Sequence, residues 1–209
     1  MKRFGDKVIL TLIAGTLVLI VLTSFGSGGH AKKLFNTKRH TFQLPDQPIR
    51  SGDLIFRNGR GMISRTFRAF NRKSPLYSHA GIIHVQNGKI YVIHLIDGGS
   101  RDGQIQMEPI QKFCSYIECS LYGIYRTKID GERINLAALS FVMKGIHFDS
   151  AFDLVSDDRM YCTEFVYKSL QTAAPDFFLP LNSISGKPYV ACDDLFLASG
   201  NHQVFTFSY

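Results

Sequence analysis

The sequence predicts an α+β domain in which helices pack on an antiparallel sheet. Two β-rich runs, 79–85 and 89–96, surround Asn87-Gly88, which is the strongest short signal for a β-hairpin. Segments with helical spacing of apolar residues are segregated from the strands, and this pattern favours α+β. The 209 residues are 45% hydrophobic and 20% charged. That composition is ordinary for a packed core and excludes a disordered, collagen-like or heptad-repeat protein.

The N-terminal part of the chain contains an apolar segment. Val8 to Phe25 has eighteen residues without a charge, follows basic residues and ends at a run of Gly and Ser. This length is near the lower limit for a helix that spans a bilayer, and the same pattern fits a signal peptide. We expect residues 1–25 to be a membrane anchor or signal peptide, 26–50 a linker and 51–209 the catalytic domain. The protein is then exported or membrane-anchored in the cell envelope, in a periplasmic or other extracytoplasmic position.

The folded part begins with a turn at Gly52-Asp53 that leads into a short strand at 54–56. Residues 62–70 carry apolar side chains at helical spacing, so they are expected to form a helix before the hairpin. The elements expected after the hairpin are strands at 104–107 and 119–126, a helix at 132–143, a helix at 160–172 with Asp157 or Asp158 as its N-cap, a short helix from Asp193-Asp194 through Ala198, and a last strand at 204–207.

The positive net charge lies mostly outside the folded part. Residues 1–39 carry +6 of the total of +7, so the rest of the chain is nearly neutral. DNA or RNA binding leaves a basic patch on the folded domain. The one basic cluster there consists of Arg57, Arg60, Arg65, Arg68, Arg72 and Lys73. We therefore expect no nucleic-acid partner.

The hairpin register pairs two histidines. With a two-residue turn at Asn87-Gly88, His94 lies opposite Gly81. His79 is two residues from Gly81, so it shares a face with His94 and is its diagonal neighbour, roughly 7–8 Å away at Cα. His84 falls on the other face because side chains alternate along a strand. The pattern therefore selects His79 and His94 as a pair.

Cys162 is the candidate nucleophile. It is expected in the first turn of the helix at 160–172, where unpaired N–H groups and the helix dipole favour the thiolate. A cysteine beside a histidine that a third polar group orients is the general arrangement for nucleophilic catalysis. We expect Cys162 to attack a carbonyl, His79 to transfer the proton and His94 to orient His79. The backbone N–H of Cys162 is one expected oxyanion donor.

Four motifs together resemble a known family. They are Gly52-Asp-Leu-Ile-Phe56, Ser78-His-Ala-Gly-Ile82, the strand with His94, and Tyr161-Cys-Thr-Glu-Phe-Val-Tyr167. In this order they resemble the permuted papain-like cysteine amidases of the YaeF/YiiX type, within the NlpC-type cysteine peptidase superfamily. Asp193-Asp-Leu195 is also similar to this permuted branch, and the resemblance covers about residues 50–200.

The resemblance implies a circularly permuted papain-like fold and a cysteine hydrolase. It maps the family's nucleophile, base and third position to Cys162, His79 and His94. The implied reaction is cleavage of an amide through a thioacyl-enzyme, in cell-wall peptides or in N-acyl or lipid-linked amides. No cofactor is implied. The expected partners are the peptide or N-acyl amide substrate and, if the N-terminal segment is kept, the membrane.

Three alternatives remain open. A His at position 94, where close relatives are expected to carry Glu, resembles the lecithin-retinol-acyltransferase-like enzymes and indicates an acyltransferase or lipid amidase. A non-catalytic cell-wall-binding module on the same fold is a second alternative. A zinc site with Cys162, His79 and His94 as ligands is the third, although the chain has no CxxC or HExxH motif.

The three other cysteines, Cys114, Cys119 and Cys192, are expected to be buried thiols. An exported chain permits a disulfide. If Cys162 stays free, at most one bridge forms among the three.

Overall fold

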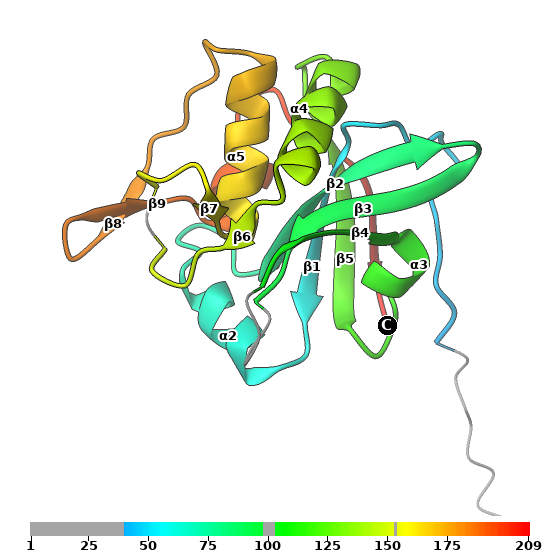
Figure 1. Ribbon diagram of the computed structural model, residues 1–209. Helices are drawn as coiled ribbons and strands as arrows, with labels where there is room; N and C mark the ends of the chain where they lie inside the picture. Colours follow the sequence, from blue (N-terminus) through cyan, green and yellow to red (C-terminus); the bar gives the residue numbers. More distant parts are fainter. Residues whose placement is uncertain (1–39, 98–102, 153) are drawn as a thin grey trace, which may run out of the picture. The chain divides into compact units, whose positions relative to one another are not determined.

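The computed structural model describes residues 40–97, 103–152 and 154–209 (Figure 1). Its centre is a six-stranded sheet with the strand order β10-β5-β1-β2-β3-β4, in which every neighbouring pair is antiparallel. The strands are β1 Leu54–Gly59, β2 His79–Gln86, β3 Lys89–Leu95, β4 Ile105–Pro109, β5 Cys119–Arg126 and β10 His202–Ser208.

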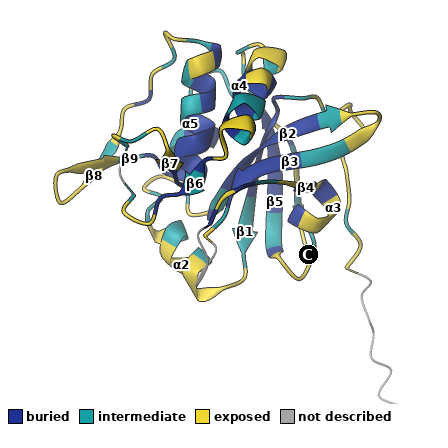
Figure 2. Ribbon diagram, viewed as in Figure 1, coloured by how far each residue is buried: buried dark blue, intermediate teal, exposed yellow. Residues whose placement is uncertain are grey.

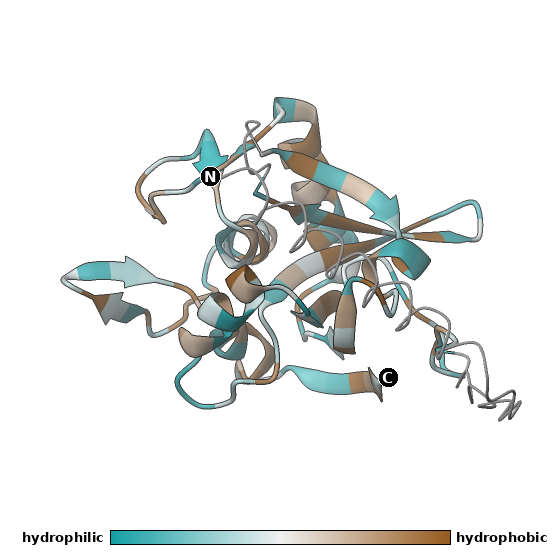
Figure 3. Ribbon diagram, turned by 90° about the horizontal axis from the view of Figure 1, so that it is seen from below, coloured by the Kyte–Doolittle hydropathy of each residue, from teal (hydrophilic) through white to brown (hydrophobic). Residues whose placement is uncertain are grey.

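Helices and two small sheets surround this central sheet. The helices are α2 Met62–Ala69, α3 Ile110–Phe113, α4 Gly131–Lys144, α5 Cys162–Ala173 and α6 Cys192–Phe196. The small sheets pair β6 His147–Phe148 with β7 Arg159–Met160, and β8 Asn182–Ile184 with β9 Lys187–Tyr189. The β8–β9 hairpin projects from the body on the side away from the β2–β3 turn, and its surface is largely hydrophilic (Figures 1 and 3).

Each face of the sheet has its own hydrophobic core, because side chains alternate along the strands. Leu54 and Phe56 of β1 face the larger core, which includes residues of α4, α5 and α6. Ile55, between them, faces a smaller core that α3 covers. Figure 2 shows the buried residues concentrated along the strands and on the inner sides of α4 and α5. The expected α+β class is confirmed for the described residues. The expected N-terminal apolar helix lies outside them.

The hairpin has the predicted register. Gln86 pairs with Lys89 and Ile82 with Ile93, so the turn contains two residues. Asn87 and Gly88 have φ angles of 51° and 73°, and a two-residue turn of this kind matches the right-handed twist of the strands. His84 is on the opposite face from His79 and His94, as expected, where its Nδ1 lies 2.9 Å from Asn135 Oδ1 of α4.

The helix that carries the cysteine begins later than predicted. Arg159 and Met160 belong to β7, so α5 starts at Cys162 with Tyr161 as its N-cap. The expected caps Asp157 and Asp158 are therefore wrong, and Asp157 instead pairs with Lys168 Nζ at 2.6 Å. The short late helix also starts before its aspartates, with Ala191 as N-cap, and Asp194 accepts a hydrogen bond from the Ala191 N–H at 2.8 Å.

Residues 40–50, part of the expected linker, lie against the smaller core. Phe42 and Ile49 pack on it, and the Tyr122 hydroxyl donates to the Gln43 carbonyl oxygen at 2.6 Å. Residues 1–25 lie outside the described residues. Within the described ranges, no helix has both the length and the hydrophobicity needed to cross a bilayer.

Candidate active site

A cavity of about 490 Å³ brings the predicted nucleophile and base to one place. Cys162, the first residue of α5, and His79, the first residue of β2, both line it. The wall is mostly apolar, and besides the ends of strands of the central sheet it includes α2, the loop at 117–118, residues 148–152 and the β8–β9 hairpin. Phe67 of α2 packs on Phe152 with ring centroids 5.3 Å apart, so two of these segments meet directly.

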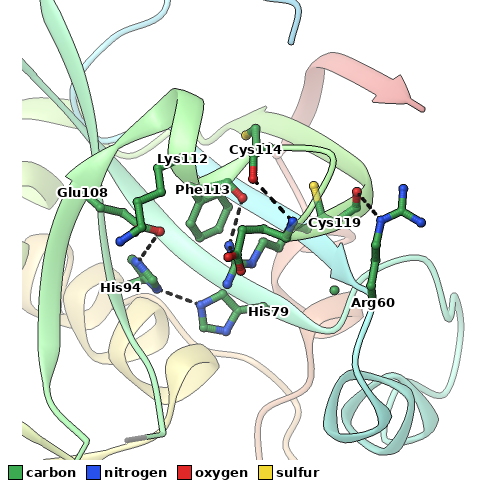
Figure 4. Close-up of polar contacts among 12 residues, drawn as sticks. Arg60, His79, His94, Glu108, Lys112, Phe113, Cys114 and Cys119 are labelled. Atoms are coloured by element: carbon green, nitrogen blue, oxygen red, sulfur yellow. Dashed lines mark hydrogen bonds and ion pairs between the residues drawn. The ribbon is translucent and has the colours of Figure 1, made fainter. Parts of the chain in front are cut away.

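His79 and His94 are in direct contact, as the hairpin register predicted. His79 Nε2 lies 2.9 Å from His94 Nδ1, and both rings pack against Phe113 of α3 (Figure 4). This contact occupies one ring nitrogen of His79. Nδ1 is the nitrogen left to exchange a proton with a reacting group.

Cys162 is 9% exposed, and its thiol contacts the backbone of Ala80 in β2. Burial raises the pKa of the thiol to about 11. Backbone groups of Ala80, Thr163 and Cys162 itself act in the opposite direction, and so does the charge of Arg57. Ala80 directly follows His79 in β2, so the sulfur lies against the backbone of the strand that carries His79. The helix terminus does favour the thiolate as expected, but desolvation outweighs it, and the resting thiol is protonated.

The two histidines are neutral near pH 7. Burial lowers the pKa of His79 well below its ordinary value, and the charges of Arg57 and His94 lower it further. Burial also lowers the pKa of His94, although the contact with Glu108 acts against this shift. A neutral imidazole can accept the proton of a thiol, which an imidazolium cannot.

Glu108 extends the pair of histidines to a third side chain that the sequence reading missed. Its Oε1 lies 3.1 Å from His94 Nε2, and its Oε2 lies 3.0 Å from Lys112 Nζ (Figure 4). Burial alone raises the pKa of Glu108, but the contacts with His94 and Lys112 outweigh it and hold the pKa at about 2. The sequence feature that could have identified Glu108 is the strand expected at 104–107. This strand pairs with β3 so that His94 lies opposite Gln106, and Glu108, two residues further on, shares the face of His94.

Arg57 places a positive charge beside the site. It pairs with His79 in the β1–β2 register, and its Nη1 donates to the Phe113 carbonyl oxygen at 2.9 Å. The guanidinium carbon also lies 4.5 Å from the centre of the Phe113 ring. These contacts fix the cation where it favours both the thiolate of Cys162 and the neutral form of His79.

The other cysteines are buried free thiols, as expected. Burial raises the pKa of Cys114 and of Cys192 well above the ordinary value, and that of Cys119 to about 11. Cys192 lines the same cavity as Cys162. Cys192 is therefore a second buried thiol in this cavity, and it can serve as a comparison for Cys162.

The predicted residues do not fit a metal site. Among the residues that the structure describes, no three or more His, Cys, Asp or Glu side chains are placed to hold one ion. In addition, His79 Nε2 and His94 Nδ1 contact each other at 2.9 Å. Each nitrogen therefore has a hydrogen-bond partner in the other ring, and the zinc alternative is not supported.

Comparisons with known proteins identify the family of the chain. The family model described as permuted papain-like amidase enzyme, YaeF/YiiX, C92 family, matches residues 48–177. The uncharacterized protein YiiX of Escherichia coli K12 is 28% identical over 128 residues, which are 59% of this chain and 58% of YiiX. The chain thus matches less than two thirds of that relative.

A solved structure shows the same fold. It is described as metalloprotein YiiX from Escherichia coli O157:H7, and it aligns with a TM-score of 0.62 at 20% identity over 76% of this chain and 98% of that one. The family match covers more than half of the chain and confirms the resemblance carried by the four motifs. The chain belongs to the permuted papain-like amidases of the YaeF/YiiX type.

Proposed function

We propose that this protein is a cysteine amidase in which Cys162 forms a thioacyl-enzyme with the acyl part of its substrate. The observation that carries the proposal is the shared cavity: Cys162 and His79 line it together, and His94 holds the far nitrogen of His79 at 2.9 Å. A nucleophile, a base and an orienting group are the three parts that covalent amide hydrolysis requires.

The reaction begins with a neutral thiol and a neutral imidazole. His79 Nδ1 takes the thiol proton as the sulfur of Cys162 bonds to the amide carbon, and the carbonyl oxygen becomes an oxyanion. Because the thiol pKa is raised to about 11, proton transfer accompanies the attack instead of preceding it. The backbone N–H of Cys162, at the first position of α5, is the proposed donor to this oxyanion.

Collapse of this intermediate breaks the C–N bond. His79 returns its proton to the leaving amine, so the amine departs neutral and the acyl group remains on sulfur. Water then attacks the thioester with His79 again as base. The products are a carboxylic acid and the free thiol. Each proton taken up by His79 is released again within one cycle.

The cavity wall favours an acyl chain over a polar peptide. Apolar side chains such as Ile63, Phe67, Phe70, Ile117 and Phe152 line most of it. A volume of about 490 Å³ lies in the range of small-molecule sites. Each methylene that a ligand buries there contributes about 0.8 kcal/mol. We therefore propose N-acyl or lipid-linked amides as the substrate class, ahead of cell-wall peptides.

The same apolar wall favours an acyltransferase as the second candidate. Apolar side chains around an acyl-enzyme reduce the access of water, so an amine or alcohol acceptor competes better for the acyl group. We also retain the proposal that residues 1–25 place the enzyme at the cell envelope, where lipid-linked substrates are present.

The test uses N-acyl amides of increasing chain length and mixed muropeptides, with mass spectrometry of the products and of the intact protein. We expect release of fatty acid from the N-acyl amides and a transient acyl adduct on Cys162. Cys162→Ala should abolish both. Cys192→Ala, which removes another buried thiol of the same cavity, should retain both. Turnover by Cys162→Ala would refute the proposal, and transfer of the acyl group to an added amine would establish the acyltransferase.

A further inference from the structure

We propose that Glu108 is a positioning residue that fixes the direction of the protons on His94 and His79, and that Lys112 holds its carboxylate in place. This inference deepens the proposed function and rests on it. It adds a fourth side chain to the three that the motifs identify. Glu108 acts on the reaction only through His94, since it is His94 that it contacts.

Two neutral imidazoles in contact can share their protons in two ways. If His79 Nε2 carries a proton and donates it to His94 Nδ1, then His79 Nδ1 has a free lone pair and can act as the base. If His94 Nδ1 is the donor, His79 carries its own proton on Nδ1, and this nitrogen then has no lone pair with which to accept the proton of Cys162. The 2.9 Å contact between the rings fits both arrangements.

Glu108 selects the active arrangement. An ionised carboxylate only accepts hydrogen bonds, so the His94 nitrogen that faces it must carry a proton. That nitrogen is Nε2, 3.1 Å from Oε1. A neutral His94 with its proton on Nε2 has a lone pair on Nδ1, and His79 Nε2 must then be the donor. The carboxylate therefore leaves Nδ1 of His79 free to take the thiol proton.

No other group in the described part of the chain competes with Glu108 for Nε2 of His94. His94 is 1% exposed, and its Nε2 has no hydrogen-bond partner elsewhere in the described part of the chain. With the ring in this orientation, the N–H of Nε2 does not point directly at Oε1. The contact at 3.1 Å therefore acts through charge and not as an aligned hydrogen bond. Such an interaction still favours a proton on Nε2, because a lone pair there would face the carboxylate.

The turn from β4 into α3 supplies the counter-charge. Lys112 follows Glu108 by four residues, and its Nζ lies 3.0 Å from Oε2, the oxygen that does not face His94. The two carboxylate oxygens thus have separate partners. His94 and Lys112 together keep Glu108 ionised, and Lys112 leaves Oε1 for His94, which is what the selection of one tautomer requires.

The direct measurement is the tautomer of each ring. In the full-length protein labelled with ¹⁵N-histidine, NMR distinguishes protonated from unprotonated ring nitrogens, and His79→Ala and His94→Ala assign the signals. We expect the proton on Nε2 in both rings and a lone pair on both Nδ1 atoms. A wild-type spectrum with the proton of His79 on Nδ1 would overturn the inference, and this result does not depend on the folding of any Glu108 variant.

Variants test the consequence for reactivity. Glu108→Gln carries an amide whose N–H₂ can donate to His94 Nε2 and so favours the inactive arrangement. In serine proteases the corresponding exchange of carboxylate for amide lowers kcat about 10⁴-fold through the wrong tautomer. We expect the alkylation of Cys162 by iodoacetamide at pH 7 to slow at least about tenfold in Glu108→Gln, with partial rescue in Glu108→Asp. Lys112→Met should show a smaller loss, and its pH profile should shift because Glu108 then titrates at higher pH.

The control is Glu132→Gln, which makes the same exchange at an exposed position of α4 and should leave the alkylation rate and pH profile unchanged. His79→Ala separates the two proposals. If His79→Ala slows alkylation and Glu108→Gln does not alter the rate, the pH profile or the tautomer of His79, only the inference about Glu108 is wrong. If His79→Ala itself has no effect, the proposed function fails.

Discussion

Asp193 holds the segment between α2, which lines the cavity, and His79, the proposed base, and its removal should weaken the fold measurably. The carboxylate is fully buried, and its Oδ2 accepts the backbone N–H groups of Arg72, Lys73 and Ser74 at 2.8, 2.5 and 3.1 Å. These three residues follow α2 and precede His79. The perturbation is the pair of substitutions Asp193→Ala and Asp193→Asn.

The hydrogen bonds set the size of the effect. A bond to a charged group contributes about 1.5–3 kcal/mol, and the lower figure applies because these amides are only partly buried and regain water. Three such bonds contribute about 4.5 kcal/mol, from which the cost of burying the carboxylate is subtracted. We expect Asp193→Ala to lose about 3 kcal/mol. Asp193→Asn keeps an oxygen but not the charge, so it should lose about half of this.

Urea unfolding of the full-length protein measures this loss as the change in the free energy of unfolding. Asp176→Ala, at an exposed position, serves as the control and should change it by less than about 0.5 kcal/mol. KM should also rise in Asp193→Ala, since α2 forms part of the cavity wall. A loss below about 1 kcal/mol in Asp193→Ala, or a larger loss in Asp193→Asn than in Asp193→Ala, would refute the reasoning.

Three further predictions concern the site and its support. Arg57→Met removes a cation that favours the thiolate, so the pH midpoint for alkylation of Cys162 should move up by as much as about one unit, while Arg65→Met, on the exposed side of α2, should not move it. Phe67→Ala should raise KM for long N-acyl amides roughly fivefold and that for short ones less, because about 1 kcal/mol of apolar contact is lost; equal effects on both would contradict the acyl-chain assignment. Burial raises the pKa of Glu164 from 4.5 to about 7 against the pull of Lys168, so the folded state binds this proton more tightly than the unfolded chain, and ionisation of Glu164 costs stability as pH rises from about 4.5 to 7. Glu164→Gln should therefore flatten the stability profile over that window, which urea unfolding at several pH values can check.

Local signals in the sequence predicted the hairpin and its consequences. Asn87-Gly88 set the turn length, the turn length set the register, and the register placed His79 and His94 on one face with His84 on the other. This chain of inference needed only the alternation of side chains along a strand. The inference succeeded because a two-residue turn allows only one register between the two strands that it joins.

The features that could not be predicted from the sequence depend on contacts between segments that are distant in the chain. The start of α5 was misplaced because β7 pairs with β6, and nothing in the period of residues 159–160 signals that pairing. Glu108 was missed for a related reason. Its position beside His94 follows from the β3–β4 register, and the connection between these strands is too long for turn chemistry to fix it. The one-turn helix α3 and the short hairpin β8–β9 are below the length at which periodicity is informative.

The candidate site residues and part of the cavity wall lie on different elements, and this separation has an evolutionary consequence. His79 and His94 lie on the two strands of the central hairpin and Cys162 lies at the start of a buried helix, whereas α2 contributes no buried residue, although it lines the cavity. Mutations on α2 can therefore accumulate with little penalty to folding. Members of this family can in this way diverge in the ligands that they bind while the cysteine and the two histidines keep their positions.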